Sequence, residues 1–331
     1  MKRGEGIDPH GSLIWGTGIL PRSLFTTGRR ARTVPRELVH KKGPGEVLLA
    51  GATMPRPDVF TVFAQWPGKH RFYHPDPAGR PDPLLLLETV RQVGIYVSHH
   101  YYRVPLDFRF IFQELADFTI DDPAPANHGP VTATAHCRPS ATPSRFAATM
   151  DVVLSAHGKR LGRGSVRWIA VRDAAYRRIR GQPAKRSGTA PAVGRRPRPA
   201  EVGRRRARDV LLLDDGDAGW RLHVDERHPY FFDHPTDHVP GMMLLEAFRQ
   251  VGWRTTVGAQ AVLLTGLSTS FLSFCELDVP IFFDSEQIHG DDLSVRVRAT
   301  QSGRTTATGT LTFATSRHHS PDLVKQSGNH D

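Results

Sequence analysis

Residues 84–94 read LLLLETVRQVG, and residues 242–252 read MMLLEAFRQVG. The offset is constant (242 − 84 = 158), and His70 and His228 share it, each followed two residues later by an aromatic pair. A repeat at a fixed offset predicts two similar folded units within one chain. Each copy also places a glutamate and an arginine inside an otherwise apolar helix, where uncompensated charge is costly. These two charged pairs are therefore candidates for function.

Both halves of the chain show the same predicted order of elements. Apolar and β-branched content predicts strands, and Asp82-Pro83 is typical of a helix start, with Asp as N-cap. The first half has strands at 47–49 and 59–64, a helix from 83 to about 101, and strands at 108–120, 131–138, 146–156 and 164–171. The second half has strands at 210–213 and 221–224, a helix at 241–258, and strands at 271–281, 293–301 and 305–315. This order predicts an α+β double hot-dog, two repeats each with a long central helix wrapped by an antiparallel sheet, rather than alternating βαβ units.

The charge of the chain is concentrated in one tract. Residues 177–208 hold twelve Arg or Lys and one acidic residue, Glu201, which accounts for the whole net charge of +11. We expect a solvated linker there and no nucleic-acid contact, because no zinc, helix-turn-helix or aromatic RNA-binding signature accompanies the tract. The expected organisation is a poorly ordered N-terminal extension at 1–32, a first repeat at 33–173, a basic Pro/Gly/Arg-rich linker at 174–209, a second repeat at 210–316 and a polar tail at 317–331.

Several classes of protein are not indicated. The two cysteines, Cys137 and Cys275, lie in no Cys-x-x-Cys motif, so neither a zinc site nor a disulfide framework is indicated. A reducing cytoplasm is therefore the simplest expectation for the location. No apolar run approaches membrane-spanning length. Walker, Rossmann and Gly-x-Ser-x-Gly patterns are missing from the sequence, so we expect neither a nucleotide cofactor nor a serine acyl-enzyme.

The candidate catalytic residues are two pairs on the repeated helices. Glu88 with Arg91, and Glu246 with Arg249, stand at i and i+3 on one helix face, and Gln92 and Gln250 extend that face. A single pair would suggest packing alone, but two copies at one offset favour function. A carboxylate there can act as a general base, and the start of the helix can offer backbone N–H groups to an acyl oxygen.

Residues before the second helix give weaker signals. His234 and His238 stand four residues apart, as metal ligands on a helix do, but Pro235 and Pro240 place them in a loop, so we expect no metal. The spacing of His228 to Asp233 matches that of glycerol-phosphate acyltransferases, although such a short pattern arises easily by chance.

Segment 240–246, PGMMLLE, resembles the Pro-Gly-Val-Leu-x-x-Glu of hot-dog β-hydroxyacyl-carrier-protein dehydratases. Their catalytic histidine stands fourteen residues before the acid, where this chain has Phe232. His74 has that spacing to Glu88, but its segment lacks the Pro-Gly. The dehydratase interpretation is weakened accordingly.

A closer resemblance covers nearly the whole predicted fold. Segments 38–42 (LVHKK), 64–67 (AQWP), 82–92 (DPLLLLETVRQ) and 232–242 (FDHPTDHVPGM) resemble the A-factor biosynthesis (AfsA-type) proteins of actinomycetes. The resemblance implies a duplicated hot-dog that transfers a β-ketoacyl group from acyl carrier protein to the hydroxyl of dihydroxyacetone phosphate. The product would cyclise toward γ-butyrolactone, butenolide or furan signals that control antibiotic production. The family's important positions map to Glu88, Glu246 and Arg249, with Arg91 as the repeat equivalent.

The hypothesis that follows assigns a role to each part. One glutamate would take the hydroxyl proton, an arginine would hold the phosphate, and apolar helix faces would line the acyl tunnel. Gln92, Gln250, Gly241, His234 and His238 are expected to contact substrate. The Pro-Gly turn at Gly241 favours the second repeat as the working site. Phosphopantetheine enters as the substrate carrier, no other cofactor and no membrane is expected, and the two repeats would pair as an intramolecular pseudo-dimer.

Two other classes of function remain open at this point. One is a hot-dog thioesterase or dehydratase that acts on a carrier-bound acyl chain. The other is a non-enzymatic regulator that binds acyl ligands, or DNA through the basic tract.

Overall fold

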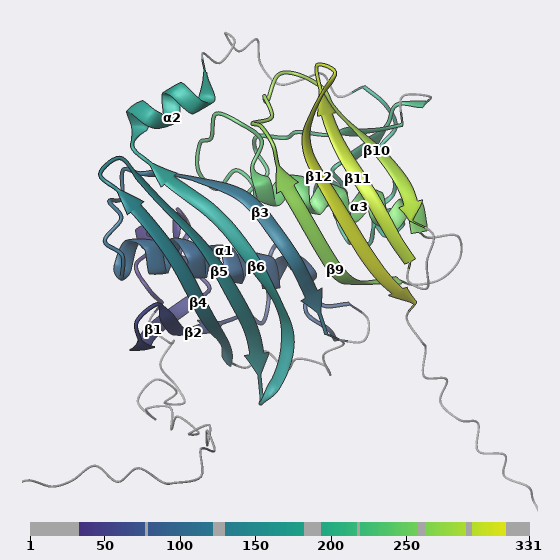
Figure 1. Cartoon of the computed structure of the whole chain (residues 1–331). Helices are drawn as coiled ribbons and strands as arrows, with labels where there is room; N and C mark the ends of the chain where they lie inside the picture. The colour runs from purple at the N-terminus through teal and green to yellow at the C-terminus, as the bar shows by residue number, and fades with distance from the viewer. Residues whose placement is uncertain are drawn as a thin grey trace, which may run out of the picture. The chain divides into compact units, whose positions relative to one another are not determined.

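The computed structural model describes residues 33–76, 79–121, 130–181, 193–216, 219–256, 262–288 and 293–315 (Figure 1). The predicted N-terminal extension (1–32) and polar tail (317–331) lie outside the described residues, as do 182–192 of the predicted linker. No helix in the described ranges is both long and apolar enough to cross a bilayer.

The first repeat is a long helix against an antiparallel sheet. Its elements are the 3₁₀ turns η2 (Arg36–Val39) and η3 (Pro44–Glu46), then β1 (Leu49–Arg56), β2 (Val59–Gln65), α1 (Pro83–His100), β3 (Arg109–Ile120), β4 (Pro130–Thr142), β5 (Arg145–Ala156) and β6 (Lys159–Val171). Helix α1 begins as the sequence predicts. The carboxylate of Asp82 accepts the Leu84 N–H at 3.0 Å, and Pro83 occupies a first-turn position that needs no N–H.

The second repeat follows the same plan. A short helix α2 (Asp173–Arg180) comes first, then η4 (Pro199–Val202), η5 (Ala207–Asp209), β7 (Leu212–Asp214), β8 (Trp220–Leu222), α3 (Gly241–Thr256), β9 (Val262–Phe271), β10 (Ile281–Ile288), β11 (Leu293–Gln301) and β12 (Arg304–Thr315).

All twelve of these strands form one continuous sheet. Their order is β1-β2-β4-β5-β6-β3-β9-β12-β11-β10-β8-β7, so each half of the sheet mirrors the other. The halves join where β3 pairs antiparallel with β9, with Leu115 opposite Thr269 and Thr119 opposite Gly266. Figure 1 shows α1 and α3 behind the same sheet, α1 behind the first half and α3 behind the second. The predicted double hot-dog, with its two repeats paired inside one chain, is confirmed.

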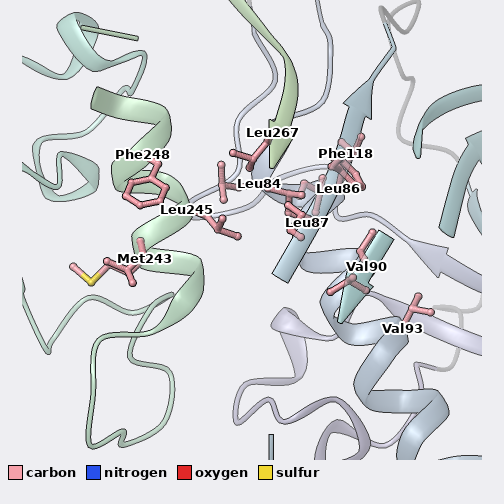
Figure 2. Close-up of a cluster of buried hydrophobic side chains, with 14 of the residues drawn as sticks. Leu84, Leu86, Leu87, Val90, Val93, Phe118, Met243, Leu245, Phe248 and Leu267 are labelled. Atoms are coloured by element: carbon pink, nitrogen blue, oxygen red, sulfur yellow. The ribbon is translucent and has the colours of Figure 1, made fainter. Parts of the chain in front are cut away.

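The core lies between the sheet and the two helices. Figure 2 shows apolar side chains of both helices meeting residues of the two central strands. The buried members labelled there are Leu84, Leu86, Leu87, Val90 and Val93 of α1, Met243, Leu245 and Phe248 of α3, Phe118 of β3 and Leu267 of β9. This shared core makes the two repeats one folded unit over residues 33–315.

The strand predicted at 271–281 is wrong. Strand β9 ends at Phe271 and β10 begins at Ile281, and the residues between them form an irregular crossing. Apolar content alone predicted the strand, but backbone groups of this crossing bond elsewhere: Leu272 N–H donates to Thr306 O, and Cys275 O accepts from Val239 N–H. Pro280, which has no N–H to offer a ladder, ends the crossing.

Part of the predicted linker is folded. Residues 173–180 form α2, and 199–209 carry the turns η4 and η5, which repeat η2 and η3 at an offset of 163 (199 − 36 = 163). The second repeat therefore begins before residue 210. Composition suggested solvation, but Arg180 pairs with Glu276 and Arg204 pairs with the buried Glu246, so carboxylates of the second repeat hold part of the basic tract in place.

Candidate active site

The first charged centre surrounds Glu88 on α1. This carboxylate is 1% exposed and accepts two hydrogen bonds from Arg91, each at 2.8 Å. Gln92 Nε2 donates to it at 2.8 Å, and Lys41 Nζ lies 3.2 Å away. Gln92 also fixes the chain before β1, because its amide accepts from Leu48 N–H and donates to the carbonyl of Glu46. Both carboxylate oxygens are engaged.

The second charged centre surrounds Glu246 on α3 with the same arrangement. Arg249 donates to both oxygens at 2.8 Å, Gln250 donates at 2.6 Å and Arg204 Nε donates at 2.6 Å. Arg204 reaches further, because its Nη1 donates to Asp82 Oδ2 at 2.6 Å. Glu246 is fully buried, and Arg204 joins it to the N-cap of α1 in the other repeat.

Lys41 and Arg204 are equivalent residues that the sequence analysis missed as site residues. They share the offset 163 (204 − 41 = 163), and the hydrogen-bond pattern repeats with them: Leu211 N–H bonds Gln250 as Leu48 N–H bonds Gln92. The segments 46–49 (EVLL) and 209–212 (DVLL) carry the signal. Equivalent residues of the two repeats are 163 apart before His70 and 158 apart from His70 onward, because the second repeat has five fewer residues between segment 209–212 and His228. An alignment at the single offset of 158 therefore does not pair Lys41 with Arg204.

Each of these cations also contacts an aromatic ring of the other repeat. Lys41 Nζ lies 5.0 Å from the Tyr230 ring centroid, and the Arg204 guanidinium lies 4.3 Å from that of Phe72. The rings of Phe72 and Tyr230 stack at 4.4 Å, and the Tyr73 and Tyr230 hydroxyls bond one another. These cation–ring, ring–ring and hydroxyl contacts between the repeats hold the two charged centres in fixed positions relative to each other.

Both helix glutamates are held ionised. Burial raises the pKa of Glu88, but the charges of Arg91 and Lys41 outweigh it and lower that pKa to about 2. Burial likewise opposes ionisation of Glu246, and Arg204 with Arg249 lowers its pKa to about 2. A carboxylate whose two oxygens are both held by cations is a weak general base.

The two centres differ in access. A cavity of about 1590 Å³ is lined by Glu88, Arg91, Lys41 and His40 of the first repeat, and by the loop 233–240 and Gly241 of the second. Among the predicted site residues, Glu88, Arg91, Gly241, His234 and His238 line this cavity, whereas Gln92, Glu246, Arg249 and Gln250 do not. The Pro-Gly turn favoured the second repeat, but the cavity combines the helix start of α3 with the charged pair of α1.

The closure of the second centre has a local cause. Residues before α1 cover it: Asp82 binds Arg204, and the carbonyl of Pro75 accepts from Arg205 at 2.8 Å. At the place equivalent to Asp82 the second repeat has Pro240, which offers Lys41 no carboxylate (82 + 158 = 240). The side chain of Arg91 is 18% exposed and that of Arg249 only 6%. Arg91 is therefore the helix arginine available to a ligand.

The loop before α3 supplies polar groups at the cavity. His234 bonds Asp233, and Lys42 N–H donates to the same carboxylate at 3.2 Å. His238 Nδ1 lies 2.6 Å from Asp237 Oδ1, and the hydroxyl of Tyr176 on α2 donates to that oxygen at 2.8 Å. The His238 contact lowers the pKa of Asp237 most, so this carboxylate is ionised at neutral pH. We place both histidines as polar lining residues.

The fold and cavity define a double hot-dog protein with a cavity lined by residues of both repeats. A family model described as A-factor biosynthesis hotdog domain (AfsA) matches residues 26–172 and 190–316. The second match begins before Arg204, in agreement with the repeat boundary seen in the structure. The chain belongs to the AfsA family.

Similar proteins cover most of the chain. A 2-oxo-3-(phosphooxy)propyl 3-oxoalkanoate synthase of Streptomyces virginiae is 34% identical over 281 residues, which are 82% of this chain and 95% of that protein. A synthase of the same name from Streptomyces coelicolor is 33% identical over 284 residues, 82% of this chain and 89% of that one.

Solved structures of other proteins are more distant. A 12:0-ACP thioesterase from Umbellularia californica is 12% identical, with a TM-score of 0.48 over 80% of this chain and all of that chain. An acyl-ACP thioesterase from Bacteroides thetaiotaomicron is 11% identical, with a TM-score of 0.44 over 78% of this chain and 98% of that chain.

Proposed function

We propose that this protein transfers a β-ketoacyl group from acyl carrier protein to the hydroxyl of dihydroxyacetone phosphate. The product named for its relatives, a 2-oxo-3-(phosphooxy)propyl 3-oxoalkanoate, is the ester of that triose phosphate with a β-keto acid. The observation that carries the proposal to this chain is the cavity, which brings an accessible arginine, Arg91, to the start of α3.

In this proposal Arg91 binds the phosphate of the acceptor. Glu88 holds one edge of its guanidinium, through Nε and Nη2, and the remaining N–H groups on Nη1 and Nη2 can donate to a phosphate oxygen. Lys41 adds a second positive charge nearby. Glu88 therefore serves to fix two cations, and it is not the proton acceptor of the reaction.

The start of α3 is the proposed binding site for the thioester carbonyl. The first N–H groups of a helix have no partner within the helix, so Gly241 and Met242 can donate to an oxyanion that develops on the carbonyl. Both residues line the cavity, and Leu87, Val90 and Phe271 give it apolar walls that suit an acyl chain.

The second charged centre has a structural role in this proposal. Glu246, Arg249 and Gln250 keep the fold of the second repeat as their counterparts do, but they do not touch substrate. The phosphopantetheine arm of the carrier protein delivers the acyl group, no further cofactor takes part, and the reaction belongs in the cytoplasm. The ester then serves as precursor of a γ-butyrolactone-type, butenolide or furan signal.

The direct test offers a defined β-ketoacyl carrier protein with and without dihydroxyacetone phosphate, with products identified by mass spectrometry. We expect the phosphorylated ester only when both are present. Release of free β-keto acid at the same rate without the acceptor would indicate a thioesterase, and formation of an enoyl product from a β-hydroxyacyl carrier protein would indicate a dehydratase.

Matched substitutions separate the two repeats. Arg91→Gln should raise the KM for dihydroxyacetone phosphate at least tenfold, because a charge-assisted contact contributes about 1.5–3 kcal/mol. Arg249→Gln should leave that KM within about threefold and lower the thermal stability instead. The reverse pattern would contradict the assignment of the site to the first repeat.

A further inference from the structure

His40 lies at the cavity in a backbone conformation that favours glycine. It caps η2 with φ 53° and ψ 51°, in the left-handed region. Its equivalent in the second repeat is Gly203 (203 − 40 = 163), with φ 64° and ψ 33°. The closed centre therefore has the residue that this conformation prefers, whereas the open centre keeps a strained histidine. Strain of this kind clusters at functional sites, and His40 lines the cavity.

The hydrogen bonds of His40 determine where its proton lies. Nδ1 of His99 is 2.7 Å from the carbonyl of Val104, which can only accept, so His99 carries its proton on Nδ1. Its Nε2 is then an acceptor, and His40 Nε2, 2.8 Å away, is the donor. Nδ1 of His40 is left with a lone pair and has no hydrogen-bond partner within the described part of the chain.

We propose that His40 is the general base and acid of the acyl transfer, an inference that rests on the proposed function. Nδ1 takes the proton of the acceptor hydroxyl while its oxygen forms the C–O bond to the thioester carbonyl. The tetrahedral intermediate then expels the phosphopantetheine sulfur as the C–S bond breaks. The imidazolium of His40 returns the proton to that sulfur, so ester and thiol form and the enzyme is unchanged.

The surroundings of His40 fit this role. It lines the cavity together with Glu88 and Arg91, and its ring lies edge-on to Phe110 at 5.1 Å, which holds the ring plane. Burial first, then His99 and Arg91, lower the pKa of His40 to about 3, so the imidazole is neutral at pH 7. A phosphate dianion bound to Arg91 would offset the cationic charge and raise the basicity of His40 as the acceptor binds.

Other candidate bases at the cavity are less suited. Glu88 has both oxygens occupied by cations and an amide. His234 is half exposed, and both it and His238 are paired with the carboxylate of the preceding residue, on the loop rather than beside the helix pair.

The test replaces His40 by the glycine that the second repeat has. His40→Gly suits the backbone, removes the base and leaves space that added imidazole can fill. We expect kcat for ester formation to fall by about 10²–10⁴-fold, with the KM for dihydroxyacetone phosphate changed less than about threefold. Imidazole should restore kcat at least tenfold above a blank that contains imidazole without enzyme.

Three controls make the result specific. His157→Gly removes an exposed histidine with φ 49° at the turn between β5 and β6, and should leave kcat unchanged. His40→Asn tolerates a left-handed conformation and fills more of the space, so it should be as slow as His40→Gly but respond less to imidazole. Thermal melting of each variant shows that the fold is kept.

The outcomes separate this inference from the proposed function. A wild-type protein that forms no phosphorylated ester would overturn both. A wild-type protein that forms it, with His40→Gly equally fast, would overturn the base role alone. A loss that imidazole does not restore, or one that is confined to KM, would also overturn it, because a packing or binding role produces those patterns.

Discussion

Replacing Arg204 should destabilise the fold strongly, although this residue lies in the basic tract that the composition predicts to be solvated. Its side chain is 3% exposed, it bonds both Glu246 and Asp82 at 2.6 Å, and it stacks on Phe72. Arg204→Met keeps much of the apolar contact with Phe72 but leaves two buried carboxylates without this cation. We expect the free energy of unfolding to fall by about 3–5 kcal/mol, the cost of removing one partner from a buried ion pair.

The lowered pKa of Glu246 corresponds to a similar magnitude. Its lowering from the ordinary value of about 4.3 to about 2 corresponds to roughly 3 kcal/mol of stability at neutral pH, shared between Arg204 and Arg249. The bond to Asp82 adds to the share of Arg204. At about 2–4 °C per kcal/mol for a domain of this size, Tm should fall by about 6–20 °C.

Differential scanning calorimetry at neutral pH is the assay, with Arg205→Met as the matched control. Arg205 is the adjacent residue, is exposed, and donates a single bond to the carbonyl of Pro75. Its loss should cost less than about 1 kcal/mol. If both variants melt within about 2 °C of each other, the network around Arg204 does not stabilise the fold as argued.

Two further expectations concern the rest of the helices. Because folding lowers the pKa values of Glu88 and Glu246, their contribution to the free energy of unfolding is complete above about pH 4.5 and is lost as the pH falls toward 2. The urea concentration at the unfolding midpoint should therefore decrease as the pH falls across this range. A midpoint that does not change with pH would contradict this expectation. Gly252→Ala should lower the free energy of unfolding by about 1–3 kcal/mol, because the new Cβ would lie 2.9 Å from the Phe313 ring. Gly94→Ala, at the equivalent position of the first repeat, has no contact below 3.4 Å and should leave the stability unchanged or raise it. Calorimetry of the two variants measures the difference.

The helices and their repeat were predictable because local signals agree with the tertiary structure. The Asp82-Pro83 start, the apolar runs and the constant offset are all visible in one dimension. The strand at 271–281 was not predictable from apolar content, because what decides the conformation there is bonding to Val239 and Thr306, distant in sequence.

The site was half predictable for a related reason. Glu88 and Arg91 follow from the repeat, and so do Glu246 and Arg249, but the sequence does not show which pair is accessible. Access depends on Asp82, which binds Arg204 and so covers the second centre, although the two residues are 122 positions apart in the chain. The bonds that orient His40 likewise come from His99, 59 residues later, so the motif LVHKK shows the residue and not its role.

The two halves that meet where β3 pairs with β9 belong to a single polypeptide. In an assembly of two identical chains, every substitution on one side of the axis appears on the other. Within one chain the two halves can differ. The first repeat has His40 where the second has Gly203, and its charged centre lines the cavity, whereas the charged centre of the second repeat is covered. A titration with the triose phosphate should accordingly saturate at one molecule per polypeptide, half the occupancy that a symmetric ancestor would show.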